Sequence, residues 1–172
     1  AAAAHRLHLG VEAVDTGREL QASAVSRRLL QDKAEVLAHP VHRKAEIEAD
    51  LRPNGRSLIL IYGWQDPNHY NYAHISSDTG QAVNVHNGMF HVFGGERVRI
   101  SSLEGPNSFT GANWTPVKLV FDGETGRCHV EVNGKRNPSL EAVDLSLRSG
   151  RCGVGSFNET GSFRNVKITG QA

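Results

Sequence analysis

The sequence predicts an all-β protein in which two antiparallel sheets stack as a sandwich or jelly roll. Short runs of alternating apolar and polar residues recur along most of the chain, with turn residues between them. The steps Asp122-Gly123 and Asn133-Gly134 lie between such runs, and a step of this kind is the strongest short-range signal for a β-hairpin. No long segment has the period of a helix. Roughly ten to thirteen short strands in this arrangement are typical of a sandwich.

The composition indicates one soluble domain covering residues 1–172. A chain of 172 residues can bury a core without metal ions or disulfides. Its net charge of +1 offers no electrostatic attraction to nucleic acid or to an anionic membrane. No apolar run reaches the roughly 18 residues of a membrane span. We see no signal peptide, as expected for a mature form, and we set the alanines at 1–4 aside as a remnant of protein production or a placeholder.

The first 38 residues have the weakest pattern. Leu7, Leu9 and Val11 alternate with polar or small residues and predict a strand. Residues 17–38 have no clean period, and we expect strands with irregular links there. The first strand of a closed sandwich often pairs with the last, and we expect this region to do so.

From residue 44 onward the pattern is clear. Ile47, Ala49 and Leu51 alternate with acidic residues, which predicts a strand with one buried face. Residues 58–62 are almost all apolar and suit a strand inside a sheet. Residues 70–76 alternate again. One side of this strand carries Asn71, Ala73 and Ile75, and the other carries Tyr70, Tyr72 and His74.

The segment 81–93 reads as a hairpin with Asn87-Gly88 as its two-residue loop. Such a loop pairs residue 86 with residue 89 and residue 84 with residue 91. A shift by one position would bury the histidines, so the apolar pattern supports this register. The core face then carries Val83, Val85, Phe90 and Val92, and the opposite face carries Asn84, His86, Met89 and His91.

The remaining strands follow at short intervals. Residues 96–102 predict a strand with Val98 and Ile100 buried, and residues 117–132 predict a hairpin. Trp114 is expected to anchor the core where that hairpin begins. Val143, Leu145 and Leu147 precede Gly150, and the last strands cover residues 151–157 and 163–169.

The two cysteines lie beside valines that should face the core. Cys128 precedes Val130 and Val132, and Cys152 precedes Val154. We favour two buried free thiols. A disulfide closing a loop of about 24 residues is the alternative, and it would require an oxidising compartment.

The chain from about Glu46 to Gly170 resembles the concanavalin A-like, LamG-type jelly roll. Four segments carry the resemblance in order: AEIEADLRP, SLILIYGWQDPNHYNYAHIS, NWTPVKLVFDGETGRCHVEVNGK and GRCGVGSFNETGSFRNVKITG. Within that superfamily the chain is most similar to the 3-keto-disaccharide hydrolase-like group. The opening L-F-x-G-x-x-L-x-x-W stretch of that group is absent. The resemblance implies lectins, carbohydrate-binding modules and glycoside-processing enzymes as relatives, and it does not select among them.

Aromatic and planar polar side chains in this pattern suit a sugar, whose ring has apolar C–H faces and outward hydroxyls. The predicted non-core face of the strands in 70–91 offers both kinds, and the next turn adds an indole. Jelly-roll families commonly bind glycans on the concave sheet. The candidate ligand-binding residues are Trp64, Tyr70, Tyr72, His74, Asn84, His86 and His91. The alternative is a solvated sheet face on which Tyr and His are simply good strand formers.

Two metal sites are weaker alternatives, and we expect no cofactor. Three histidines on one sheet can hold zinc with an open position for water, but the sequence has no tight His-x-His spacing. The resemblance implies a structural calcium in many relatives, yet no calcium-loop pattern is present. The residues concerned are His74, His86 and His91 for zinc, and Asp66, Asp122, Asp144 and Asn165 for calcium.

Glu46, Glu48 and Asp50 share one face of one strand. A family of retaining glucanases with this fold carries Glu-x-Asp-x-Glu, whereas the order here is Glu-x-Glu-x-Asp and the neighbouring Trp is missing. Retaining chemistry needs carboxyls about 5 Å apart, and residues four apart on a strand lie about 13 Å apart. We therefore favour an exposed strand face with basic partners. The candidates for these partners are Arg43, Lys44 and Arg52.

We expect a secreted or periplasmic, lectin-like module that binds an oligo- or polysaccharide, with Trp64 stacked on a sugar ring. The alternative is a glycoside-processing enzyme of the 3-keto-disaccharide hydrolase-like kind on the same face. One of the histidines, Glu96 or Glu46 would then act as general base. A structural or adhesion module that meets another protein is a third possibility. The sugar and the oligomeric state stay open.

Overall fold

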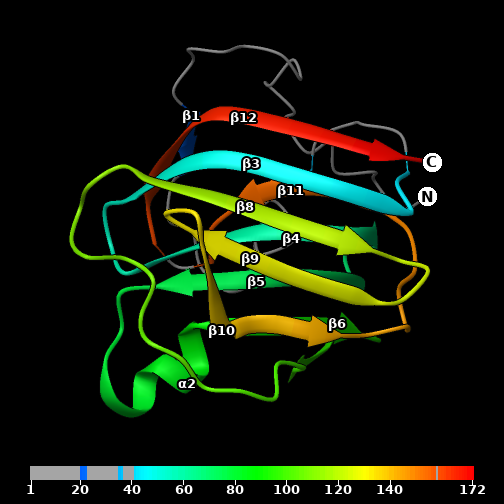
Figure 1. The fold of residues 1–172 in the computed structure, drawn as a ribbon, viewed down its shortest axis with the longest axis horizontal. Helices are drawn as coiled ribbons and strands as arrows, with labels where there is room; N and C mark the ends of the chain where they lie inside the picture. Colours follow the sequence, from blue (N-terminus) through cyan, green and yellow to red (C-terminus); the bar gives the residue numbers. More distant parts are fainter. Residues whose placement is uncertain (1–19, 23–34, 37–40, 158) are drawn as a thin grey trace, which may run out of the picture.

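The computed structural model describes residues 20–22, 35–36, 41–157 and 159–172, and these residues form two six-stranded sheets. In spatial order, sheet A consists of β1 (Leu20–Ala22), β12 (Gly161–Gln171), β3 (Lys44–Pro53), β8 (Thr115–Asp122), β9 (Arg127–Val132) and β10 (Lys135–Val143). Sheet B consists of β2 (Glu35–Val36), β11 (Arg151–Gly155), β4 (Ser57–Asp66), β5 (His69–Ser76), β6 (Gly88–Phe93) and β7 (Glu96–Arg99). Figure 1 views the two layers through sheet A.

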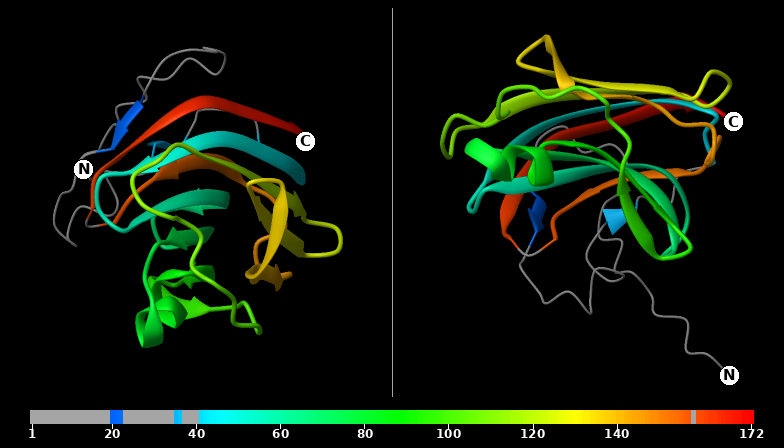
Figure 2. Two further views of the ribbon diagram at one scale, coloured as in Figure 1. Left: turned by 60° about the vertical axis from the view of Figure 1, so that its left-hand side comes forward. Right: turned by 90° about the horizontal axis from the view of Figure 1, so that it is seen from below.

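All strand pairs of the described residues are antiparallel, so the predicted sandwich is confirmed. Sheet A arches over sheet B in Figure 2. The expected pairing of the first and last strands is seen for β1, which lies along β12. The strand predicted at Leu7–Val11 and the alanines at 1–4 lie outside the described residues. Within the described part of the chain, no helix is long and apolar enough to cross a membrane.

The core lies between the sheets and follows the predicted alternation. β3 buries every second residue, including Ile47 and Leu51, and β8 does the same with Leu119 and Phe121. β4 contributes its side chains from the facing sheet, so the predicted apolar strand does occupy a sheet interior. The largest fully buried side chains of this core are Tyr62, Phe109, Phe121, Phe163, Ile47, Leu51, Leu58, Leu60 and Ile75.

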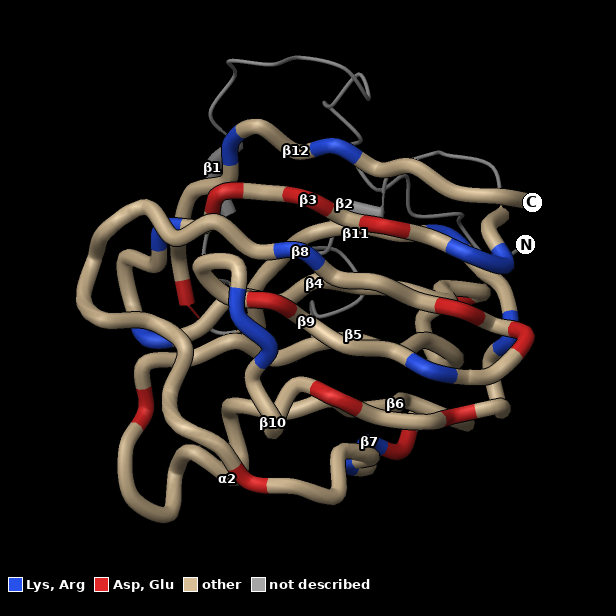
Figure 3. Tube along the Cα trace, viewed as in Figure 1, with Lys and Arg blue, Asp and Glu red and all other residues tan. Residues whose placement is uncertain are grey.

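The outer face of sheet A is charged and cross-paired. Glu46 of β3 lies 2.8 Å from the Nζ of Lys118 on β8, and Asp50 lies 3.1 Å from the Nε of Arg164 on β12. Figure 3 shows acidic residues along β3 beside basic residues of its neighbours. The predicted pairing of this face with basic residues is confirmed, although its acidic residues are half-buried. The partners are Lys118 and Arg164, which the sequence did not predict.

The two hairpins predicted between residues 117 and 143 are present. β8 pairs with β9 in one continuous register, which runs from Val117 opposite Val132 to Asp122 opposite Arg127. Asn133 and Gly134 join β9 to β10 with φ angles of 53° and 74°. Positive φ at both central residues is the requirement of the tight turn that suits the twist of a hairpin, which is why Asn-Gly occurs there.

The hairpin predicted around Asn87-Gly88 is wrong. Residues 83–86 form one helical turn, α2 (Val83–His86), after the 3₁₀ turn η2 (Gly80–Ala82). Gly88 is the first residue of β6 rather than part of a loop. The predicted faces reverse as a result. Met89 is fully buried in the inter-sheet core, whereas Phe90 and Val92 face away from sheet A.

Tertiary contacts explain why Asn87-Gly88 is not a turn. The Asn87 backbone is extended, and its buried amide donates to Ser139 Oγ at 2.5 Å and accepts from Ser108 Oγ at 2.7 Å. A Cβ on Gly88 would lie 2.4 Å from Nη1 of Arg99, so a larger residue there would displace the Arg99 side chain. Contacts with residues distant in the sequence therefore determine the conformation at Asn87 and Gly88.

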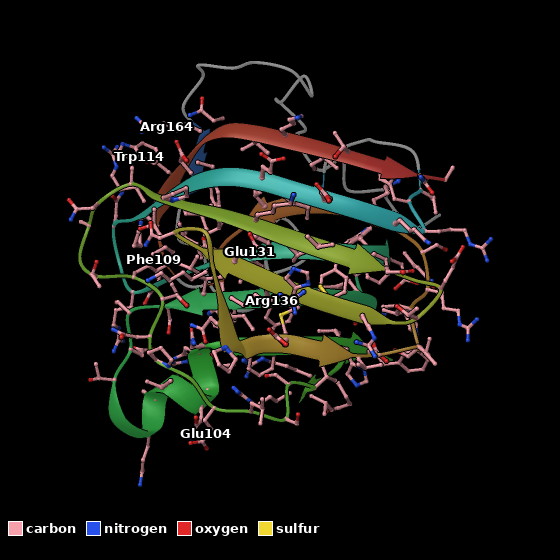
Figure 4. All side chains as sticks on the ribbon, in the orientation of Figure 1. Glu104, Phe109, Trp114, Glu131, Arg136 and Arg164 are labelled. Atoms are coloured by element: carbon pink, nitrogen blue, oxygen red, sulfur yellow. The ribbon has the colours of Figure 1, made fainter. Side chains whose placement is uncertain are left out.

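Two further expectations about burial are wrong. Val98 is 49% exposed, because β7 is an edge strand of sheet B. Trp114 is half-buried and lies outside the core, between the guanidinium groups of Arg52 and Arg164 at 4.4 and 4.2 Å from its ring. Figure 4 shows Trp114 and Arg164 close together near the start of β8.

Cys128 and Cys152 are buried and unpaired, as favoured from the sequence. Burial raises the pKa of the Cys152 thiol to about 12 and the pKa of the Cys128 thiol further still. Because a thiolate is the reactive form of cysteine, both residues act as small core side chains.

The two leucines at 119 and 145 allow a matched test of this core. Leu119→Ala should lower the free energy of unfolding by about 2–5 kcal/mol, because Leu119 is fully buried between the sheets. Leu145→Ala removes the same atoms from a half-exposed side chain and should cost less than about 0.5 kcal/mol. Urea unfolding of both variants measures the difference. Equal losses would contradict the assigned core.

Candidate functional site

A second apolar cluster covers the outer face of sheet B. The pairing of β4, β5 and β6 places Tyr72 between Ile61 and Phe90, and it places Ile59 beside His74. We call this cluster the aromatic face. It consists of Ile59, Ile61, Trp64, Tyr70, Tyr72, Phe90 and Val92, with Phe157 packed against it.

The rings of the aromatic face form a continuous row. The ring centroids of Trp64 and Tyr70 lie 4.8 Å apart, and those of Tyr70 and Tyr72 lie 5.9 Å apart. Tyr72 then stacks on Phe90 at 5.4 Å and meets the edge of Phe157 at 4.9 Å. These separations fall in the range of favourable aromatic pairs, so each ring packs against the next.

The aromatic face is covered, and the expectation that its side chains point into solvent is wrong. Trp64 and Tyr70 are each 7% exposed, Tyr72 is fully buried and His74 is 4% exposed. The predicted sharing of one face by Tyr70, Tyr72 and His74 is nevertheless correct, because alternation on β5 fixes it.

His74 is a buried histidine with no hydrogen-bond partner at either ring nitrogen. Its ring lies 5.4 Å from that of Phe157 and 5.3 Å from that of His86. Burial, with the nearby positive charge of Arg97 and the ring of His86, holds the pKa of His74 well below its ordinary value. The imidazole is therefore neutral at pH 7, and neither nitrogen has a hydrogen-bond partner among the described residues.

His86 belongs to α2 and pairs with a buried carboxylate. Its Nδ1 lies 2.5 Å from Oδ2 of Asp78, which is only 5% exposed, whereas the His86 side chain is 40% exposed. The other carboxylate oxygen of Asp78 lies 3.5 Å from Nη1 of Arg56. Asp78 thus orients an imidazole that solvent can reach.

Arg97 closes the other side of the site. Its guanidinium lies 4.0 Å from the centre of the Phe90 ring, and its Nε donates to the hydroxyl of Tyr72. Its Nη2 donates to the carbonyl of Val85 in α2 at 2.8 Å. Arg97 therefore ties β7 to both the aromatic face and the helical turn that carries His86.

Two of the seven predicted site residues lie elsewhere. Asn84 is on α2, where its amide donates to Oε1 of Glu104 at 2.7 Å. His91 is on the inner side of β6 beside Asn71, and its Nδ1 lies 3.7 Å from Oδ2 of Asp144. Both misplacements follow from the wrong hairpin, because a helical turn at 83–86 breaks the period-two pattern.

Three residues of the site were missed by sequence reasoning. Phe157 follows β11, Arg97 lies on an edge strand and Asp78 lies in a turn. No local pattern distinguishes them. An Asp eight residues before a His is the only signal that the sequence offered for the Asp78–His86 pair.

The metal sites considered from the sequence do not assemble. Among the described residues, no three His, Cys, Asp or Glu side chains are placed to hold one ion. His91 lies on the opposite side of sheet B from His74. The four calcium candidates make separate local contacts: Asp66 with His69, Asp122 with the backbone of Glu124, Asp144 with Ser146, and Asn165 with Asp50.

Known proteins share the fold of this chain. No family model matches it, and no curated protein matches its sequence. The carbohydrate-binding module CBM66 from Bacillus subtilis superposes with a TM-score of 0.60 at 15% identity, over 75% of this chain and 76% of the module. A candidate glycosyl hydrolase from Parabacteroides distasonis gives 0.54 at 13% identity, over 76% and 80% of the two chains. Galectin LEC-6 from Caenorhabditis elegans gives 0.50 at 14% identity, over 91% and 92%.

These likenesses show the fold. The chain is a concanavalin A-like jelly roll, as the sequence resemblance implied, and it is structurally similar to carbohydrate-binding modules and lectins. Because one fold of this kind hosts many activities, the function has to be argued from the site.

The neutral state of His74 predicts a pH-dependent stability. The unfolded chain protonates this ring below about pH 6.5, whereas the folded chain does not, so the free energy of unfolding falls as the pH falls from about 7 to 5. The slope contributed by His74 is at most about 1.4 kcal/mol per pH unit. Urea unfolding at about pH 7, 6 and 5 measures it.

His74→Phe should remove most of this slope. His129 also has a lowered pKa, through burial and the charge of Arg136, so His129→Gln reports its separate share. A His74→Phe protein that keeps the full slope of the wild type would show that His74 is protonated in the fold.

Proposed function

We propose that this protein binds a glycan at the accessible rim of the aromatic face. The observation that carries the proposal is the convergence of His86, Arg97 and Phe157 on one end of a rigid aromatic row. The rim supplies an apolar ring edge, a guanidinium fork and an imidazole. A sugar, with its apolar C–H face and outward hydroxyls, matches that combination.

Each residue of the site has a distinct role in this proposal. Trp64, Tyr70, Tyr72 and His74 form the buried floor, whose packing fixes the rim. Arg97 is exposed and already spread over Phe90, so little side-chain freedom is lost when it binds a hydroxyl. His86 is held by Asp78 and keeps its remaining ring nitrogen for a ligand.

The structural neighbours support the same class of ligand. A carbohydrate-binding module and a galectin are among the proteins that share this fold, although their low identities transfer no residue roles. We further propose the secreted or periplasmic location in which such modules meet polysaccharides. A fractionation experiment on the source cells would test it.

A glycan array followed by calorimetry on the best glycan tests the binding site. Arg97→Lys keeps the charge and loses the planar fork, and it should weaken binding by about tenfold or more. Arg164→Lys is the matched control, because Arg164 also lies over an aromatic ring but on sheet A. Absence of any glycan ligand, or equal weakening by the control, would contradict the proposal.

The Asp78–His86 pair favours a second candidate function. A carboxylate that orients a solvent-accessible imidazole is the arrangement by which enzymes position a general base. The protein would then be a glycoside-processing enzyme acting at the same rim, in line with the resemblance to the 3-keto-disaccharide hydrolase-like group. His86 replaces Glu96 and Glu46 as our choice of base, because Glu46 is paired to Lys118 on the other sheet.

Hydrolysis assays on ordinary and 3-keto glycosides test this second function. His86→Gln should lower kcat by about 10²–10⁴-fold, the usual contribution of general acid–base catalysis. His69→Gln is the matched control, since His69 pairs with Asp66 at 3.0 Å on the inner side of β5. A His86→Gln protein with wild-type turnover would exclude His86 as the base.

A further inference from the structure

Sheet A contains an opening that neither proposed function uses. β9 and β10 pair at Arg136 opposite Glu131, and then again at Glu141 opposite His129. Four residues of β10, 137–140, leave the ladder while β9 advances by two positions. A bulge of this size separates the two strands locally, and in Figure 1 the ribbon of β10 bends away from β9.

Buried hydrogen bonds hold the bulge in place. Asn137 donates from Nδ2 to the carbonyl of Pro106 at 2.9 Å and accepts from the backbone of Ser139 at 3.1 Å. Asn87 donates to both Ser139 Oγ and the carbonyl of Pro106. Since these groups are buried and mutually satisfied, the opening is a fixed part of the fold.

Arg136 and Glu141, which flank the bulge, line a cavity of about 410 Å³ together with residues of β9 and of the segment after β7. A volume of this order is within the range of small-molecule sites, about 300–1,000 Å³. Its apolar wall includes Leu103 and Val143, whose exposed fractions are 57% and 64%. Ile100 closes the inner end as a partly buried side chain.

The polar lining carries a surplus positive charge. The lining contains two arginines, Arg127 and Arg136, and one carboxylate, Glu141, which leaves one surplus positive charge. Of the other titratable lining residues, His129 is neutral at pH 7 because burial and the charge of Arg136 lower its pKa, and Cys128 is neutral because burial raises the pKa of its thiol. Figure 4 labels Arg136 and Glu131 on the two strands that border the opening.

The guanidinium of Arg136 has N–H donors that its neighbours do not use. Its Nη2 lies 3.1 Å from Nδ1 of His129, and its Nη1 lies 3.7 Å from Oε1 of Glu141, beyond hydrogen-bond length. Its Nε has no acceptor in the described part of the chain. The unused N–H groups of this guanidinium can donate charge-assisted hydrogen bonds to a carboxylate.

We propose that this cavity is a second ligand site, which binds a hydroxylated carboxylic acid of monosaccharide size. The carboxylate pairs with Arg136, and Arg127 adds positive potential at the other end of the cavity. Ligand hydroxyl groups donate to Glu141 and accept from the free ring N–H of His129, and the C–H face packs on Leu103 and Val143. The site is independent of the glycan rim on sheet B.

Nuclear magnetic resonance titration of the whole chain with glucuronate tests the proposal. Glucose is the matched ligand control, because it keeps the ring and lacks the carboxylate. Saturable amide shifts should appear with glucuronate at residues 100–103, 127–129 and 141–143, and they should be absent with glucose. Equal shifts with both ligands, or glucuronate shifts confined to other residues, would overturn it.

Two lining variants should move the affinity in opposite directions. Arg136→Gln should weaken glucuronate binding by about tenfold or more, through loss of charge-assisted hydrogen bonds. Glu141→Gln removes the carboxylate that competes for Arg136 and should tighten binding by about threefold or more, a gain that misfolding cannot produce. Arg43→Gln, an exposed arginine outside the cavity, should change nothing. Weaker binding in Glu141→Gln, or equal loss in Arg43→Gln, would exclude an anion anchored at Arg136.

Discussion

Strands β4 and β5 bury side chains on both of their faces, and the arrangement of both layers depends on this. Their inner side chains, among them Leu58, Leu60 and Ile75, complete the inter-sheet core against sheet A. Their outer side chains, Ile59, Ile61 and Tyr72, form a second cluster that must itself be covered. Because apolar area on both sides of a strand is withdrawn from water, these strands cannot slip in register without exposing one set. The aromatic row is therefore as rigid as the core.

A buried polar network connects the two candidate sites. Asn87 directly follows His86, and its amide bonds Ser139 in the bulge that opens sheet A. Ser108 and Asn137 extend the same network between the layers. A satisfied network of this kind is strongly position-specific, because any partner left unpaired in the interior costs free energy. One set of contacts thus holds α2 against sheet B and holds the β9–β10 opening apart.

Most of the strands and about half of the candidate site could be predicted. Alternation alone placed Ile47 and Leu51 inside, Glu46 and Asp50 outside, and Tyr72 and His74 on a shared face. Alternation does not tell whether a face meets solvent, and both faces of β5 turned out to be buried. The Asn-Gly rule succeeded at residues 133–134, where the backbone has the required positive φ, and failed at 87–88, where side-chain partners hold Asn87 extended.

The sequence by itself determined most of the strands and, within them, which side chains share a face, since both follow from the period-two geometry of neighbouring residues. Only the tertiary structure decided the chemistry. Asp78 contacts His86, Arg97 contacts Tyr72, and Arg136 contacts His129. In each pair the fold brings together two residues from separate segments of the chain. These contacts depend on the order of the strands and on a bulge that is fixed by contacts between residues up to 52 positions apart. No local sequence pattern encodes either feature.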